Sequence, residues 1–366
     1  MKNKIKSIQI LRGLAALSVV MFHYRFYLVP TGSSMAVPDK LFGWGAFGVD
    51  LFFVISGFIM IYVTNGQGHG VHTSFNFLKN RFIRILPTYY ILLLFAFLSS
   101  GAMSIFHYPE KVENLISALT FRPYIIDNPP FYTTGGGIYN IRWTINYELY
   151  FYLAFSVCLL IKPRFLALCS WFLLPIVLAF FSKEDITLSV AGYHYSSIML
   201  RFITNPIIFE FGIGVLAGYT FLYLRDKISL NSFCLPLLVT LLIAYGLFTR
   251  TLKTHDLISS LSYFLLILTF ALSNSIIMRH KLIMSPLVKL GDISFSLYLI
   301  HNPVTYLIFW NLKKTHPEII STYFGFFIMI ITAIVFAWLS HRYIEVKLTG
   351  KIRSYLSRGK TPPQAI

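Results

Sequence analysis

Long apolar runs separated by short polar segments fill this chain from residue 8 to residue 341. Most runs approach the length of about 20 residues that a helix needs to cross the roughly 30 Å hydrocarbon core of a bilayer. The pattern predicts an all-α, polytopic membrane protein with about ten transmembrane helices. The predicted spans are 8–28, 46–64, 85–100, 146–161, 165–181, 203–223, 233–248, 257–275, 287–310 and 322–341.

Composition supports this class, because 56% of the 366 residues are hydrophobic and only 12% are charged. When the loops are assigned alternately to the two sides, roughly two thirds of the Lys and Arg residues fall on the side of the N-terminus. We therefore expect both termini in the cytoplasm and an uncleaved first span. The net charge of +17 then reflects orientation in the membrane, and we expect no nucleic-acid partner.

No soluble domain fits between the predicted spans. We expect one membrane domain over 1–345, followed by a basic cytoplasmic tail over 346–366. The three cysteines have no paired spacing, which predicts neither a disulfide framework nor a zinc site, and we expect no metal.

The first predicted span carries two ionisable residues, Arg12 and His23, eleven positions apart. Eleven residues of helix make about three turns, so both side chains project from one face, roughly 16 Å apart along the axis. Each residue alone also fits a structural role, Arg12 as a snorkelling anchor and His23 as a polar residue at the outer interface. Because ionisable groups inside spans are costly, their shared face favours part of a path through the protein.

Two more charged clusters precede the third span. Asp50 opens the second span within the glycine-containing segment 45–58, where it also fits a simple helix-start charge. Arg81 and Arg84 lie three residues apart in a predicted cytoplasmic loop. On a helix they would share a face that suits a phosphate-bearing ligand, although ordinary positive-inside bias also explains them.

A polar stripe enters the fourth span from the outer side. Thr144, Glu148 and Tyr152 are spaced i, i+4 and i+8, and Trp143 lies beside them. A carboxylate at this depth needs a partner or water, which favours a functional role over a purely structural one.

A second stripe lies in the ninth span, where Ser294, Tyr298 and His301 are spaced i, i+4 and i+7. These positions share one face of a helix. A stripe of hydroxyls that packs helices together is the alternative interpretation.

Together these motifs resemble one family, the acyltransferase type 3 family of bacterial membrane enzymes, over about residues 8–345. Single motifs are weak evidence, but all five occur here in the family's order. They are Arg12-x10-His23, the segment 47–58 around Asp50, Arg81-x-x-Arg84-x-x-Pro87, Trp143-Thr144-x-x-x-Glu148-x-x-Phe151-Tyr152 and Ser294-Phe295-x-Leu297-Tyr298-Leu299-x-His301.

The resemblance implies a multi-pass enzyme of the bacterial inner membrane that transfers an acyl group other than an aminoacyl group. The donor would be cytoplasmic acetyl-CoA or another acyl-CoA, and the acceptor a hydroxyl of a surface or lipid-linked glycan such as O-antigen or exopolysaccharide. Arg81 and Arg84 would bind the donor phosphates. Arg12 would place the donor or stabilise the oxyanion.

His23 would then be the general base, because neutral imidazole suits proton abstraction at physiological pH, with His301 as its competitor. Glu148 would orient His23 or bind the acceptor. The expected substrate contacts are Asp50, Trp143, Thr144, Tyr298 and His301.

Two alternatives stay open, an acyltransferase with a small-molecule acceptor and a proton-coupled transporter. The residues do not distinguish direct transfer from a covalent relay, nor do they identify the acyl group, the sugar or the oligomeric state.

Overall fold

A computed structural model describes residues 4–29, 32–134, 139–228, 230 and 232–358. This part of the chain is helical and contains no strand, as the apolar pattern predicted. In order, the elements are α1 Lys6–Tyr24, η1 Arg25–Tyr27, α2 Ala36–Phe42, η2 Gly43–Ala46, α3 Phe47–Thr64, α4 Val71–Ser99, η3 Ala102–His107, α5 Pro109–Thr120, α6 Arg142–Cys158, α7 Arg164–Ser182, α8 Ile198–Thr204, α9 Ile208–Leu224, α10 Cys234–Phe248, α11 Leu257–Leu272, α12 Asn274–Ile277, α13 Lys281–Asp292, α14 Ser294–Thr315, α15 Pro317–Ile320, α16 Tyr323–Ser340, η4 His341–Leu348 and α17 Thr349–Arg358.

A helix lies at each of the ten predicted ranges. Six helical stretches in the described residues are long and apolar enough to cross a membrane, or seven if the bent pair α13 and α14 forms one span. The helices α10 and α11 are apolar but shorter. The chain is therefore a multi-pass membrane protein, and the total of ten spans and the cytoplasmic termini stay predictions.

Two predicted boundaries differ from the structure. The segment before the third span is not a loop, because α4 begins at Val71 and carries Arg81 and Arg84 within the helix. The ninth predicted span, 287–310, is broken at Ile293, where α13 and α14 meet at 65°. Just before the break, Gly291 packs on α1 so closely that a Cβ there would lie 1.9 Å from the backbone oxygen of Gln9.

Close backbone contact joins α3 to α9. A Cβ on Gly57 would lie 2.2 Å from the backbone oxygen of Phe211, and one on Gly214 would lie 1.9 Å from that of Val54. Small residues allow helices in a membrane to approach in this way. Further along, Gly218 meets Ile61 and the ring of Tyr62 meets Phe221. The contacts from Val54–Gly214 to Tyr62–Phe221 thus advance along both helices, so α3 and α9 run parallel, as the second and sixth spans of an alternating topology would.

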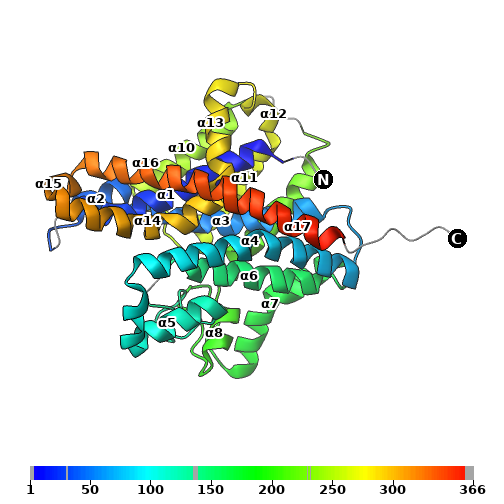
Figure 1. The fold of residues 1–366 in the computed structure, drawn as a ribbon. Coiled ribbons are helices and arrows are strands. Elements are labelled where there is room, and N and C mark those ends of the chain that lie inside the picture. The colour runs from blue at the N-terminus through cyan, green and yellow to red at the C-terminus, as the bar shows by residue number, and fades with distance from the viewer. Residues whose placement is uncertain (1–3, 30–31, 135–138, 229, 231, 359–366) are drawn as a thin grey trace.

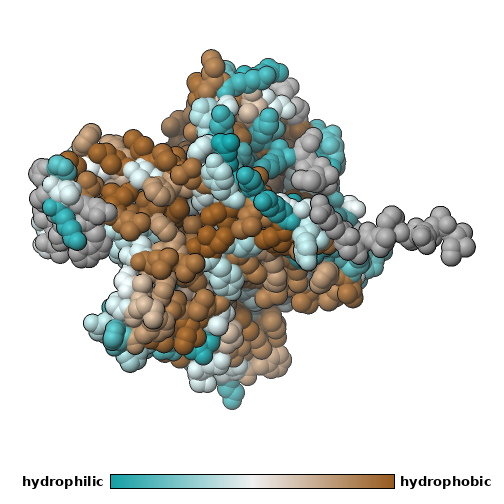
Figure 2. All heavy atoms as spheres, in the orientation of Figure 1, coloured by the Kyte–Doolittle hydropathy of each residue, from teal (hydrophilic) through white to brown (hydrophobic). Residues whose placement is uncertain are grey.

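The longer helices lie roughly alongside one another, with α1, α3, α14 and α16 forming one part of the bundle and α4, α6 and α7 another (Figure 1). Figure 2 shows hydrophobic residues over the middle of the visible face and hydrophilic residues toward its ends. Large apolar side chains such as Leu241, Phe248 and Phe327 are exposed. Their exposure is typical of helices whose outer surface meets lipid.

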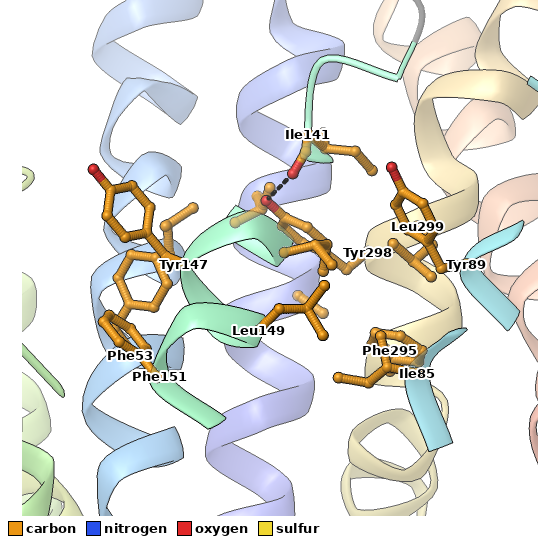
Figure 3. Packing of buried hydrophobic residues seen from close by; sticks show 14 of the residues in the cluster. Phe53, Ile85, Tyr89, Ile141, Tyr147, Leu149, Phe151, Phe295, Tyr298 and Leu299 are labelled. Carbon is orange, nitrogen blue, oxygen red and sulfur yellow. Dashed lines mark hydrogen bonds between the residues drawn. The ribbon is translucent and has the colours of Figure 1, made fainter. Parts of the chain in front are cut away.

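Aromatic packing fixes α6 against its neighbours. The ring of Phe53 on α3 meets Tyr147 and Phe151 of α6 edge-on, with centroids 6.1 and 5.5 Å apart (Figure 3). On another face of α6, Tyr298 of α14 donates a hydrogen bond of 3.4 Å to the backbone oxygen of Ile141. These contacts orient the predicted polar stripes of α6 and α14 toward the same part of the interior of the helix bundle.

Candidate active site

Three cavities follow one another through the helix bundle. The near cavity lies at the end of the bundle where α1 begins, and it shares Arg81 and Arg84 with the central cavity. The central cavity in turn shares Val49 and Tyr298 with the far cavity. The three cavities thus form a series in which neighbouring cavities share wall residues. The predicted site residues are distributed along this series of cavities.

The near cavity is polar and basic. Its walls come from the end of α3, the first half of α4 and α17. The polar residues lining it are Thr64, Gln67, His72, Thr73, Asn76, Asn80, Arg81, Arg84 and Arg353. Three guanidinium groups and several amide and hydroxyl groups suit an anion with many hydrogen-bonding atoms. The described part of the predicted tail therefore contributes to the site through Arg353.

Arg81 connects the near and central cavities. Its guanidinium lies over the rings of Phe77 and Tyr152, with Cζ 5.4 and 5.2 Å from the ring centroids. These rings hold the side chain by cation–π contact while its charge faces the cavities. Arg84, one turn further along α4, lines the same two cavities.

The central cavity collects the charged residues of the first and fourth predicted spans. Arg12 lines it, donates a 3.1 Å hydrogen bond to Gln9, and interacts electrostatically with Arg84 and Glu148. Glu148 accepts a hydrogen bond from the hydroxyl of Tyr152, its neighbour in the predicted stripe. The remaining walls are mostly apolar, so charges in this cavity act with little screening by water.

The two histidine candidates are in contact with each other. Nε2 of His301 lies 3.1 Å from Nδ1 of His23, and their ring centroids are 4.9 Å apart. The sequence motifs present them as competitors and carry no sign of this contact, because it depends on how α1 packs against α14. His23 lines the far cavity, whereas His301 is fully buried behind it.

One choice of tautomers satisfies every contact of the pair. Nδ1 of His301 lies 3.3 Å from the backbone oxygen of Leu297, and Nδ1 of His23 lies 3.0 Å from that of Val19. A proton on each Nδ1 satisfies these carbonyls and lets His23 donate also to Nε2 of His301. This assignment leaves Nε2 of His23 as a proton acceptor.

Thr144, Tyr298 and Trp143 lie where the central and far cavities meet. The hydroxyls of Thr144 and Tyr298 are 2.8 Å apart, so the stripes of α6 and α14 join. Tyr298 lines both cavities, Thr144 the central one and Trp143 the far one. Trp143 packs edge-on against Phe131, with ring centroids 4.7 Å apart.

Asp50 does not line any of the three cavities. Its side chain is fully buried, and its carboxylate meets His255, which lines the far cavity. The backbone N–H of His255 donates to Oδ2 of Asp50 at 2.8 Å, and Nδ1 of His255 lies 2.6 Å from Oδ1. A direct substrate contact of Asp50 stays a prediction, since its connection to the cavity passes through His255.

Several residues at the site lie at positions that the sequence motifs do not specify. His255 lies in a loop before α11, and Asn140 in the loop before α6 accepts a 2.9 Å hydrogen bond from Asn302. Glu345 accepts a 3.0 Å hydrogen bond from Ser296 and meets His341 at 2.9 Å. The spacing of His341 and Glu345, i and i+4, is a detectable signal for that last contact.

Comparison with known proteins agrees with the motifs. The model of the family described as "Acyltransferase domain" matches residues 5–342. The exopolysaccharide production protein ExoZ of Rhizobium meliloti (strain 1021) is 32% identical over 177 residues, which cover 48% of this chain and 50% of that protein. The chain thus spans about half the length of this curated relative. No solved structure matches the chain significantly. The match over nearly the whole chain shows that the protein belongs to this acyltransferase family.

Proposed function

We propose that this protein is a membrane O-acyltransferase that moves an acyl group from acyl-CoA at the near cavity to a glycan hydroxyl at the far cavity. The observation that carries the proposal is the series of three cavities in which neighbours share wall residues. The cavity at one end of the series is basic, and the cavity at the other end is lined by His23. In this topology both termini and the near cavity face the cytoplasm of a bacterial inner membrane. The ten predicted helices all cross that membrane.

The near cavity would hold the nucleotide of the donor. Arg81, Arg84 and Arg353 supply charge-assisted hydrogen bonds for phosphate groups, and the amides of Asn76 and Asn80 supply further polar contacts. The thin pantetheine arm then passes between Arg81 and Arg84 into the central cavity, whose remaining walls are mostly apolar. Acetyl-CoA is the simplest donor that fits this arrangement.

Transfer would occur where Val49 and Tyr298 separate the central and far cavities. Nε2 of His23 takes the proton of the acceptor hydroxyl as its oxygen attacks the thioester carbonyl. The oxyanion collapses to the ester, the C–S bond breaks, and the CoA thiolate receives the proton from the His23 imidazolium. His301 is a positioning residue in this scheme, because its contact with Nδ1 sets the tautomer of His23.

The other candidates act on the donor side, including Glu148, which lines the central cavity and not the far cavity of His23, so we assign it a donor-side role in place of the expected one. Arg12 balances negative charge in the central cavity, including the charge that develops on the thioester oxygen. Glu148 and Tyr152 hold Arg81 at the boundary between the near and central cavities. The far cavity combines the aromatic ring of Trp143 with hydroxyl and amide groups, as expected of a site for a polar, ring-shaped acceptor.

The acceptor is a hydroxyl of a surface or lipid-linked glycan. The name of the relative, an exopolysaccharide production protein, supports this class, with O-antigen as the related possibility. The direct experiment incubates purified protein with labelled acetyl-CoA and purified exopolysaccharide, and it measures free CoA and acylated glycan by mass spectrometry. We expect both products in equal amounts. Absence of both with every acyl-CoA offered would reject the proposal.

A further inference from the structure

A buried group of two carboxylates and one imidazole lies beside the far cavity. Asp50 of α3, Glu210 of α9 and His255 of the loop before α11 offer ligand atoms that all lie within 4.8 Å of one another. Asp50 and Glu210 have 0% and 2% of their surface exposed. Neither the family motifs nor the acyl-transfer scheme uses Glu210 or His255.

The polar atoms of this group lack ordinary partners among the described residues. Both carboxylate oxygens of Glu210, Oδ1 of Asp50 and Nδ1 of His255 are buried without hydrogen bonds. Oδ1 and Nδ1 are only 2.6 Å apart, yet they do not have the geometry of a hydrogen bond. Buried polar atoms are nearly always satisfied, so an unpartnered group whose three ligand atoms lie within 4.8 Å of one another calls for a further partner at this place.

The charges around Glu210 have the sign that a cation requires. The charged groups that act on Glu210 are Asp50 and Asp256, and both are acidic. Two carboxylates buried together repel each other strongly unless one of them is protonated or positive charge is placed between them. A divalent cation would neutralise the charges of Asp50 and Glu210, with neutral His255 as the third ligand.

We propose that Asp50, Glu210 and His255 bind one divalent transition-metal cation, with Zn²⁺ as the first candidate. One nitrogen and two oxygen donors are within the ligand set that zinc accepts, at distances of about 2.0–2.2 Å. Two ligand atoms around a tetrahedral ion with these bonds lie about 3.4 Å apart. Side-chain rotation must therefore bring the most distant ligand atoms, which lie within 4.8 Å, closer together and must widen the 2.6 Å approach of Asp50 Oδ1 to His255 Nδ1.

The ion has a structural role in this proposal. It ties the loop that carries His255 to α3 and α9, two helices already packed closely through Gly57 and Gly214. The ring of His255 meets Trp143 edge-on, with centroids 5.5 Å apart. Binding would therefore fix the wall of the far cavity. The proposal revises the sequence expectation of no metal, since the three ligands are far apart in the chain.

The test uses the full chain, purified in detergent with a tag that contains no histidine and stripped with a chelator. Zn²⁺ is titrated against a fluorescent competitor, and bound metal is counted by mass spectrometry. We expect one tight equivalent per chain in the wild type and in Glu113→Gln, a control at an exposed ion pair. Glu210→Gln and Asp50→Asn should bind at least about tenfold more weakly.

A second measurement keeps the proposal testable if the variants fail to fold. Co²⁺ added to the stripped wild-type protein should produce the visible absorption bands of a four- or five-coordinate site with a nitrogen ligand. A wild type that binds no stoichiometric Zn²⁺ or Co²⁺ would overturn the proposal. So would an affinity that is unchanged in Glu210→Gln. Neither readout depends on acyl transfer, so this proposal can fail while the proposed function stands.

Discussion

Removing the guanidinium of Arg81 or Arg84 should weaken donor binding by a predictable amount. Both residues line the near and central cavities, so each is expected to meet a phosphate of acyl-CoA. A hydrogen bond to a charged group contributes about 1.5–3 kcal/mol. At about 1.4 kcal/mol for each factor of ten, Arg81→Ala and Arg84→Ala should each raise the Kd by about 10- to 150-fold.

The structure separates two contributions at Arg81. Its guanidinium lies over the rings of Phe77 and Tyr152, so alanine removes these cation–π contacts as well as the charge that faces the donor. Arg81→Lys keeps the charge and loses the planar fork, and we expect only partial recovery of affinity. Arg84 has no such aromatic contact among the described residues. The loss of donor affinity in Arg84→Ala should therefore reflect mainly the loss of the charge.

The assay is calorimetry with a non-hydrolysable acyl-CoA analogue and purified protein. Arg342→Ala is the matched control, because Arg342 lies outside the three cavities and stacks on Trp338 and Tyr343. The control should bind like the wild type. Unchanged affinity in both Arg81→Ala and Arg84→Ala would refute the assignment and leave the two arginines as determinants of membrane orientation.

Three further predictions follow from the site, the packing and the topology. His23→Ala should lower kcat by about 10²–10⁴-fold. His301→Gln should lower kcat only about two- to tenfold, with an unchanged KM for the donor. At matched expression, an inactive His301 variant together with an active His23 variant would reverse the roles of the two histidines. Gly214→Ala should destabilise the protein by about 1–3 kcal/mol in thermal unfolding, since its Cβ would lie 1.9 Å from a backbone oxygen, whereas Gly350→Ala meets nothing within 4 Å and should be neutral. A cysteine at Lys79 should react with an impermeant reagent only from the cytoplasmic side, and labelling from outside would contradict the topology.

The helices and the polar faces could be predicted because they depend on local patterns. Apolar length places a helix at every predicted range, and helical spacing puts Thr144 and Tyr152 on the face of Glu148 that meets the central cavity. The three-residue spacing of Arg81 and Arg84 indicated a shared helix face, and both residues line the same cavities, although the sequence placed them in a loop and not within α4.

Contacts between distant elements could not be predicted from those patterns. The pairing of His23 with His301 depends on the packing of α1 against α14, and the meeting of Asp50 with His255 depends on a loop. The break at Ile293 lies beside Gly291, whose close fit against α1 is likewise a contact between distant segments. A single sequence without tertiary information contains no signal for the relative position of these groups.

Transfer across the membrane is the central claim, and reconstituted vesicles test it most directly. Purified protein is placed in liposomes that enclose the purified glycan acceptor, and labelled acetyl-CoA is added only outside. The proposed path predicts labelled glycan inside the vesicles, a signal lost in His23→Ala and in protein-free liposomes. The contradicting result is a glycan that becomes labelled only when donor and acceptor are in the same compartment. In that case the acyl group would not pass through the series of cavities.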